Sequence, residues 1–118
     1  MTNTTDRQYR PLVYICSPYS GDTENNIKEA RGFCRYALDQ GQIPLAPHLM
    51  FPQFMKDAVP NERDLVIFMD IVLMGKSSEV WVLSDTISAG MEIEINKAKQ
   101  RRQPVCYFNS KFEEVEPL

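Results

Sequence analysis

The sequence predicts an α/β fold, a small three-layer sandwich with a mostly parallel sheet of four to five strands. Short apolar runs rich in β-branched and aromatic residues alternate with segments of helical periodicity along the 118-residue chain. Such alternation is typical of parallel sheets, because right-handed crossovers place the helices on the two faces of the sheet. The chain length fits one domain with its own core.

The first half of the chain predicts two strands and one helix. Residues 11–17, PLVYICS, form an apolar strand that ends in the turn-rich sequence PYSGD. Residues 43–47, IPLAP, predict a short strand at an edge of the sheet, because proline cannot donate to a central ladder. Between them we expect a helix over residues 25–40, with Gly41 positioned to end it. Its apolar positions at helical spacing are Ile27, Ala30, Cys34, Ala37 and Leu38.

The middle of the chain combines an irregular segment with an unusually apolar helix. Residues 48–60 are rich in Phe and Met, so we expect them to fold over another part of the molecule. A helix is predicted over residues 61–76, whose run LVIFMDIVLM is apolar on almost every side. One face of this helix should pack against the sheet. The other predicts a self-association surface, and hence a homodimer or higher homo-oligomer.

The last third of the chain predicts two more strands. Residues 79–84 and 104–108 form them, with a helix between them that begins near Gly90. We expect strand order 2-1-3-4, an arrangement of the flavodoxin-like or Rossmann-like kind. In this order the loops PYSGD and SDTISAG meet at the carboxyl ends of the first and third strands, where ligands bind in open α/β sheets. The acidic tail, residues 110–118, has no assigned structure.

Composition and charge exclude several classes of function. The net charge of −3, with 43% hydrophobic and 25% charged residues, argues against binding to nucleic acid or to a membrane surface. No apolar run approaches the length of a membrane span, and residues 1–10 are polar without a signal-peptide core. We therefore expect a cytoplasmic protein.

The cysteine and histidine content predicts no metal site and no cofactor. Cys16, Cys34 and Cys106 are odd in number and widely spaced, so each is expected as a small buried apolar residue. His48 is the only histidine, which excludes a multi-histidine metal centre. Neither the P-loop pattern nor the GxGxxG pattern is present.

Two carboxylates occupy helix positions that face apolar residues. In SAGMEIEINKA, residues 88–98, Glu94 follows Met91 by three residues and precedes Ala98 by four, so it points into the apolar stripe. Glu92 falls on the polar face of the same helix. Burying a carboxylate is costly unless it is paired, neutral or lining a cavity, which favours a functional role for Glu94. The alternative is that Glu94 lies at the rim of the stripe and reaches solvent.

Asp70 is surrounded more completely by apolar residues. Its neighbours three and four positions away are Val66, Ile67, Leu73 and Met74. Such surroundings raise the pKa of a carboxyl group and favour its protonated form. Two carboxyls with different pKa values are the usual apparatus for cleaving a glycosidic bond. Spacing alone does not determine whether Asp70 and Glu94 meet.

Three sequence elements resemble the nucleoside 2-deoxyribosyltransferase superfamily, which includes deoxynucleoside monophosphate N-glycosidases. They are VYICSPYSG at residues 13–21, Asp70, and S-x-G-M-x-x-E-x-x-x-A at residues 88–98. The resemblance covers residues 12–108 and is closest to small uncharacterised bacterial and phage proteins. It implies a single domain over residues 1–118, with tails at 1–10 and 110–118.

The resemblance implies a retaining reaction with three catalytic residues. Glu94 would attack C1′ of a nucleoside or nucleotide, Asp70 would protonate the departing base, and Tyr14 would orient the nucleophile. Gly90 and Ala98 set the register on Glu94, whereas an alignment on GME alone would select Glu92. Tyr14 can equally be a core residue of its strand.

The resemblance also implies a set of substrate-binding residues. Those expected to hold the sugar 5′ end or a phosphate are Ser17, Ser20, Gly21, Ser88 and Gly90. Those expected to enclose the base are Tyr19, His48, Met91 and the segment 51–54. Simpler roles are a hydrogen bond within a loop for His48, a helix cap for Ser88, and an ordinary tight turn for PYSGD.

Two departures from the resembling proteins limit what can be carried over. Monophosphate-cleaving relatives have an arginine where this chain has Ser20, so a phosphate requirement is left open. In relatives a neighbouring subunit completes the site, a role that would fall to Asn109 or Ser110 here. The alternative to an enzyme is a binding module that holds a nucleotide or an ADP-ribose-like ligand without cleaving it.

Overall fold

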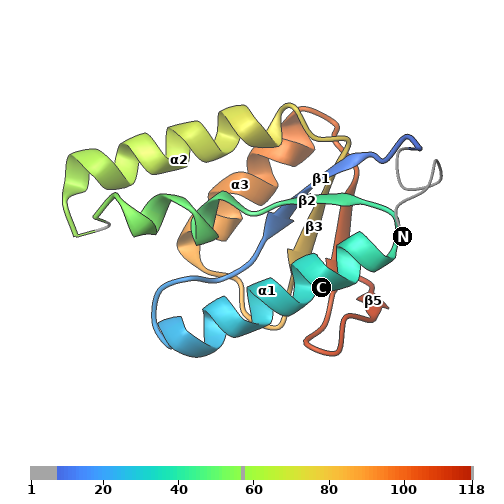
Figure 1. The fold of residues 1–118 in the computed structure, drawn as a ribbon. Coiled ribbons are helices and arrows are strands. Elements are labelled where there is room, and N and C mark those ends of the chain that lie inside the picture. The colour runs from blue at the N-terminus through green and yellow to red at the C-terminus, as the bar shows by residue number, and fades with distance from the viewer. Residues whose placement is uncertain (1–7, 57, 118) are drawn as a thin grey trace.

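The computed structural model describes residues 8–56 and 58–117 and shows the predicted α/β sandwich (Figure 1). Most of the predicted N-terminal tail, residues 1–7, lies outside the described residues. The sheet order is β2-β1-β3-β4-β5, which confirms the expected order and the edge position of the second strand. The strands are β1 (Leu12–Cys16), β2 (Ile43–Leu45), β3 (Glu79–Leu83), β4 (Val105–Phe108) and β5 (Glu114–Val115).

All strand pairs are parallel except the last. Strand β1 pairs with β2 and β3, and β3 pairs with β4, each in parallel. Strand β5 is antiparallel to β4, with Tyr107 opposite Val115. Strand β5 lies in the C-terminal tail, which sequence patterning left without structure because only two residues pair.

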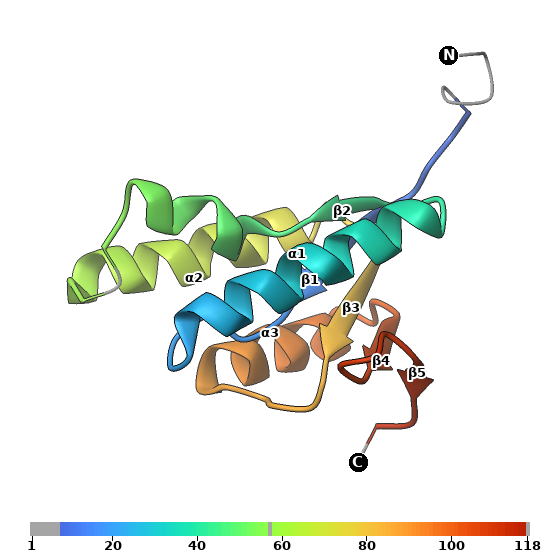
Figure 2. The same cartoon turned by 60° about the horizontal axis from the view of Figure 1, so that its bottom comes forward.

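Three helices cover the two faces of the sheet. They are α1 (Thr23–Asp39), α2 (Pro60–Met74) and α3 (Ala89–Gln100). Helix α1 packs on one face, whereas α2 and α3 pack on the other (Figures 1 and 2). The segment expected to be irregular contains two 3₁₀ turns, η2 (Pro47–Leu49) and η3 (Phe51–Gln53). Within the described residues, no helix has the length and apolar character to span a membrane.

The alternation of strand β1 divides its side chains between two cores. Val13 and Ile15 join the core beneath α1. Tyr14 and Cys16 join the core beneath α2 and α3. Successive side chains of a strand point to opposite faces, so this division follows directly from the sequence. Consequently, Tyr14 and Cys16 lie on the face that carries both buried carboxylates.

The buried face of α1 differs from the set of apolar positions noted in the sequence. Phe33, which was not in that set, is fully buried, whereas Leu38 is 38% exposed. Phe33 lies within an aromatic cluster, with ring centroids 5.2 Å from Phe108 and 6.1 Å from Trp81. The large ring turns the helix so that residues 30, 33 and 37 face the sheet.

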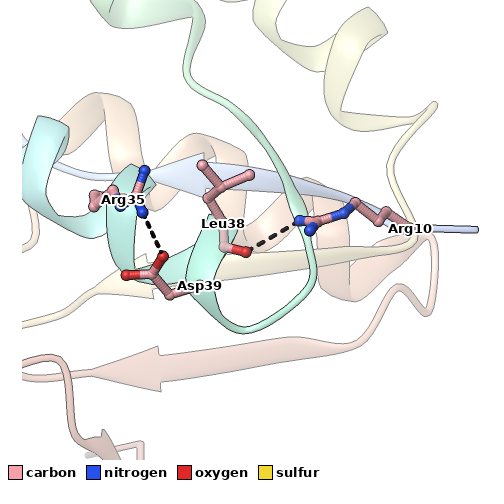
Figure 3. Close-up of polar contacts among 4 residues, drawn as sticks. All are labelled: Arg10, Arg35, Leu38 and Asp39. Carbon is pink, nitrogen blue, oxygen red and sulfur yellow. Dashed lines mark hydrogen bonds and ion pairs between the residues drawn. The ribbon is translucent and has the colours of Figure 1, made fainter. Parts of the chain in front are cut away.

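The C-terminal end of α1 is tied to the start of the chain (Figure 3). The Arg10 guanidinium donates a hydrogen bond of 3.1 Å to the carbonyl oxygen of Leu38. This carbonyl belongs to the last turn of the helix, where carbonyls lack an intrahelical donor. Arg35 and Asp39 form an exposed ion pair of 3.0 Å on the same helix, which contributes little to stability.

Truncation of the two apolar α1 side chains tests which face of the helix is buried. Phe33→Ala should lower the free energy of unfolding by about 3–5 kcal/mol, because it leaves a cavity in the aromatic cluster. Leu38→Ala, the control on the same helix, should cost under about 1 kcal/mol. Urea denaturation measures both values. Equal losses would contradict the observed rotation of α1.

Candidate active site

A cavity of about 470 Å³ lies at the carboxyl ends of β1 and β3, between the segments expected to meet there. The loop after β1 contributes Ser17, Tyr19 and Ser20 to its wall. The start of α3 contributes Ser88, Gly90 and Met91, and Asp70 and Glu94 also line it. His48 completes the set of predicted residues that the cavity brings together.

A hydrogen-bonded group of three side chains from three elements borders the cavity, with Asp70 and Glu94 in its wall and the buried Tyr14 behind Glu94. The Tyr14 hydroxyl on β1 donates a hydrogen bond of 3.0 Å to Oε2 of Glu94 on α3. The Asp70 carboxyl on α2 is hydrogen-bonded to Glu94. Glu94 is 9% exposed and Asp70 only 5%, while Glu92 lies on the exposed face. The assignment of faces from helical spacing is therefore confirmed.

Burial and mutual repulsion shift the ionisation of the two carboxyls. The pKa of Asp70 is raised to about 8, mainly by burial. The negative charge of Glu94 and the hydrogen bond to Glu94 add to this rise. Burial also raises the pKa of Glu94, but hydrogen bonds from Asp70, Tyr14 and Cys16 oppose this rise. Two interacting carboxyls titrate as a pair. The contacts favour a single proton held on Asp70 and a negative charge held on Glu94.

Tyr14 and Cys16 stay protonated, with the Tyr14 hydroxyl donating to Glu94 and the Cys16 thiol lying beside Glu94 and 4.0 Å from the Met91 carbonyl oxygen. Burial is the main cause that raises the pKa of each group, followed by the charge of Glu94. Cys16 follows Tyr14 by two residues on the same face of β1, so both point toward α3. The sequence indicated only a buried apolar residue at Cys16. Strand alternation would have placed its thiol beside Tyr14.

His48 is a neutral hydrogen-bonding group on the cavity wall. Its Nε2 lies 2.6 Å from the hydroxyl oxygen of Ser17. Burial lowers the pKa of His48 to about 4, so the imidazole carries no charge at neutral pH. His48 therefore makes the hydrogen bond within the loops that was its simpler expected role, and it also lies on the cavity wall. Among the described residues, no group of three or more His, Cys, Asp or Glu side chains is placed to hold a metal ion.

Backbone geometry fixes the two loops that border the cavity. Gly21 has φ of 95°, which fits a turn residue, and it does not line the cavity, so its ligand contact stays a prediction. The Asn26 amide donates to the carbonyl oxygens of Tyr19 at 3.1 Å and Ser20 at 3.0 Å, which holds the loop against α1. The Ser88 hydroxyl accepts a hydrogen bond of 3.2 Å from the Met91 amide and caps α3.

Several lining residues were missing from the sequence prediction. In the segment 51–54, Phe51 is buried in the fold and Phe54 is exposed, and neither lines the cavity. Pro52 of this segment does line it, and the residues not foreseen are Met55, Arg63, Val66, Ile67, Ala89 and Ile93. Four of them could have been predicted. Residues 63, 66 and 67 share a face of α2 with Asp70, and Ala89 directly precedes the predicted Gly90.

Asp70 makes the folded protein less stable as pH rises. The folded state retains the Asp70 proton up to about pH 8, whereas an unfolded aspartate, with its ordinary pKa of 3.8, loses it near pH 4. The unfolded state then binds fewer protons, so the unfolding free energy falls between about pH 4 and pH 8. Asp70→Asn should remove the part of this fall that comes from Asp70 and be more stable than the wild type at pH 8, by about 1–3 kcal/mol.

Thermal unfolding at pH 4 to 8 measures this effect. Asp64→Asn, at an exposed position of the same helix, is the control and should follow the wild-type profile. If the stability of Asp70→Asn falls with pH as steeply as that of the wild type, Asp70 does not carry the buried proton.

Comparison with known proteins shows a shared fold and a family for the chain. A 2-deoxyribosyltransferase from the psychrotolerant bacterium Bacillus psychrosaccharolyticus has a similar structure, with a TM-score of 0.63 and 16% sequence identity. The match covers 89% of this chain and 77% of that one, and it shows a shared fold. No curated protein matches the chain. One family model, described as a domain of unknown function (DUF7768), matches residues 11–108, and the chain belongs to that family.

Proposed function

We propose that the chain is an enzyme that cleaves or transfers the N-glycosidic bond of a nucleoside or nucleotide through a retaining mechanism. The observation that carries the proposal is the contact of Glu94 with both Tyr14 and Asp70 in the wall of a ligand-sized cavity. A buried carboxylate with three donors and a carboxyl group that retains a proton are the two groups this chemistry needs. The fold shared with a 2-deoxyribosyltransferase supports the same proposal.

The first step forms a covalent intermediate. A Glu94 oxygen attacks C1′ of the sugar, and the bond between C1′ and the base nitrogen breaks. The electron pair of that bond goes to the base, which takes the proton from Asp70. Tyr14 keeps its hydroxyl proton and holds the Glu94 carboxylate in position through the observed hydrogen bond.

The second step releases the sugar from Glu94. Water attacks C1′ in hydrolysis, or the nitrogen of a second base attacks it in transfer, and the bond from C1′ to Glu94 breaks. Asp70, now ionised, accepts the proton of the incoming nucleophile and returns to its starting state. Its raised pKa suits both roles, because the proton is held near neutral pH yet is readily given up.

The closeness of the two carboxyls favours retention over inversion. Inverting enzymes separate them by about 6.5–9.5 Å, which leaves room for a water molecule. Asp70 and Glu94 are in direct hydrogen-bond contact, which leaves no such room. The substrate would enter above the pair, where the cavity borders both carboxyls.

Substitution of Glu94 is the direct test of the proposed activity. Glu94→Gln should lower release or exchange of free base by about 10³-fold or more, because the amide is a poor nucleophile. Glu92→Gln, two residues away on the exposed face, should keep the wild-type rate. The assay uses deoxynucleosides and their 5′-monophosphates, with and without an acceptor base, read by chromatography. Identical rates in wild type and Glu94→Gln would exclude this role, and ligands recovered intact throughout would favour the binding module.

We further propose that two copies of the chain associate through the outer face of α2. Leu65, Phe68 and Val72 form an exposed apolar stripe there, and Phe68 alone is 63% exposed. Phe68→Glu should shift the protein toward monomer in sedimentation at micromolar concentration. Leu38→Glu introduces the same charge on α1 and should leave association unchanged. A wild-type monomer at these concentrations would contradict the proposal.

A further inference from the structure

The first turn of α3 is closed through a sulfur atom. The Ser88 hydroxyl accepts a hydrogen bond of 3.2 Å from the Met91 amide, and the Ser88 amide donates one of 3.4 Å to the Met91 sulfur. Together the two residues form a capping box, in which each side chain satisfies the backbone amide of the other. Such a box usually has Glu or Gln three residues after the cap, and an acidic group suits a helix start. A thioether accepts only weakly, so methionine at this position needs a separate reason.

The neighbourhood of Met91 supplies that reason. Met91 is 3% exposed, lines the cavity and precedes Glu94 by three residues. Residues three apart on a helix are neighbours, so a carboxylate at position 91 would be buried beside Glu94 and the two negative charges would repel each other. A thioether accepts the Ser88 amide without this charge. It is also apolar enough to pack in the core with Ile95 and Ala98.

Strand β1 holds the same turn of α3 from the side of the sheet. The Cys16 sulfur lies 4.0 Å from the Met91 carbonyl oxygen, and the Tyr14 hydroxyl donates to Glu94 in the following turn. The start of α3 is therefore fixed at its cap by Ser88 and against the sheet by β1. Loss of the sulfur acceptor would free the Ser88 amide and loosen the turn that sets the position of Glu94 against Tyr14.

We propose that Met91 is a positioning residue, whose thioether closes the cap of α3 without adding a second negative charge beside Glu94. The consequence for Glu94 rests on the proposed function, because it concerns the carboxylate that attacks C1′. The closure of the cap does not rest on that function and is measured separately. The groups that act on Glu94 from the elements packed against it are Tyr14 and Cys16 of β1 and Asp70 of α2.

Three substitutions of Met91 separate the acceptor from the charge. Met91→Leu removes the acceptor and keeps an apolar side chain of similar size, Met91→Gln keeps an uncharged acceptor, and Met91→Glu introduces the usual acidic residue of the box. Hydrogen exchange of the Ser88 amide, followed by NMR, measures the cap. Exchange should be several-fold faster in Met91→Leu and stay close to the wild-type rate in the other two variants. An unchanged exchange rate in Met91→Leu would overturn the sulfur cap.

Titration of the Glu94 side-chain carboxyl by carbon-13 NMR measures the effect of the charge. The signal is assigned with Glu94→Gln. Met91→Glu should move the titration of Glu94 to higher pH, because a neighbouring negative charge disfavours ionisation, whereas Met91→Gln should not. The acid side of the pH profile for base release should move in the same direction. Asn96→Glu places the same charge on the exposed face two residues after Glu94 and should leave both profiles unchanged.

Kinetic constants decide the question if Met91→Glu does not fold. Met91→Leu should lower kcat by about ten-fold, more than Met91→Gln does, because it alone loses the acceptor that fixes the helix start. A larger loss in Met91→Gln would overturn the inference. Equal titrations of Glu94 in the wild type and Met91→Glu, or equal shifts in Met91→Glu and Asn96→Glu, would overturn it as well.

The remaining cavity groups and the proposed function are controlled separately. Arg63 and His48 also line the cavity and are the same in every variant, so a shift in the titration belongs to position 91. Failure of the proposed function is distinguishable, since the wild type would then release no base. The exchange of the Ser88 amide and the titration of Glu94 would still report on the cap and the charge.

Discussion

The buried contact between Asp70 and Glu94 is the constraint on which the rest of the site depends. Two carboxyls in one apolar setting cannot both be ionised without a large cost, so one proton must stay with the pair. Hydrogen bonds from Tyr14 and Cys16 decide where the charge remains, because both donate to Glu94. The result is an asymmetric pair, with a proton on one side and a stabilised carboxylate on the other, in the wall of a cavity.

The fold produces this contact from segments that are distant in the sequence. Parallel pairing of β1 with β3 aligns the loops that follow them, and the helices α2 and α3 cover the same face of the sheet. The alternation of β1 turns Tyr14 toward that face. Burying the pair reduces stability at neutral pH, and a cost of this kind is typical of functional sites. The cores on both faces of the sheet offset it.

Periodicity was sufficient to predict the main strands and helices and the choice between Glu94 and Glu92, because both depend on local rules that tertiary packing did not override. The strand order was an expectation from the α/β fold class. Contacts that arise from tertiary packing were not predictable in this way. In the sequence, Arg63 is indistinguishable from an ordinary surface charge. Its place in the cavity wall follows only from the positions of α2 and α3 side by side. Phe33 was missed because an aromatic cluster sets the rotation of α1. Strand β5 was missed because two paired residues are too few to show a strand pattern. The turn role of Gly21 depends on its φ angle, which composition does not specify.

The most direct test of the account is the mass of the intact protein after rapid mixing with deoxynucleoside 5′-monophosphates and acid quenching. The account predicts a species heavier by one sugar phosphate, with the addition mapped to Glu94 after proteolysis, and no such species in Glu94→Gln. Base release by the wild type without any adduct, or an adduct that persists in Glu94→Gln, would contradict the assignment of Glu94 as the nucleophile.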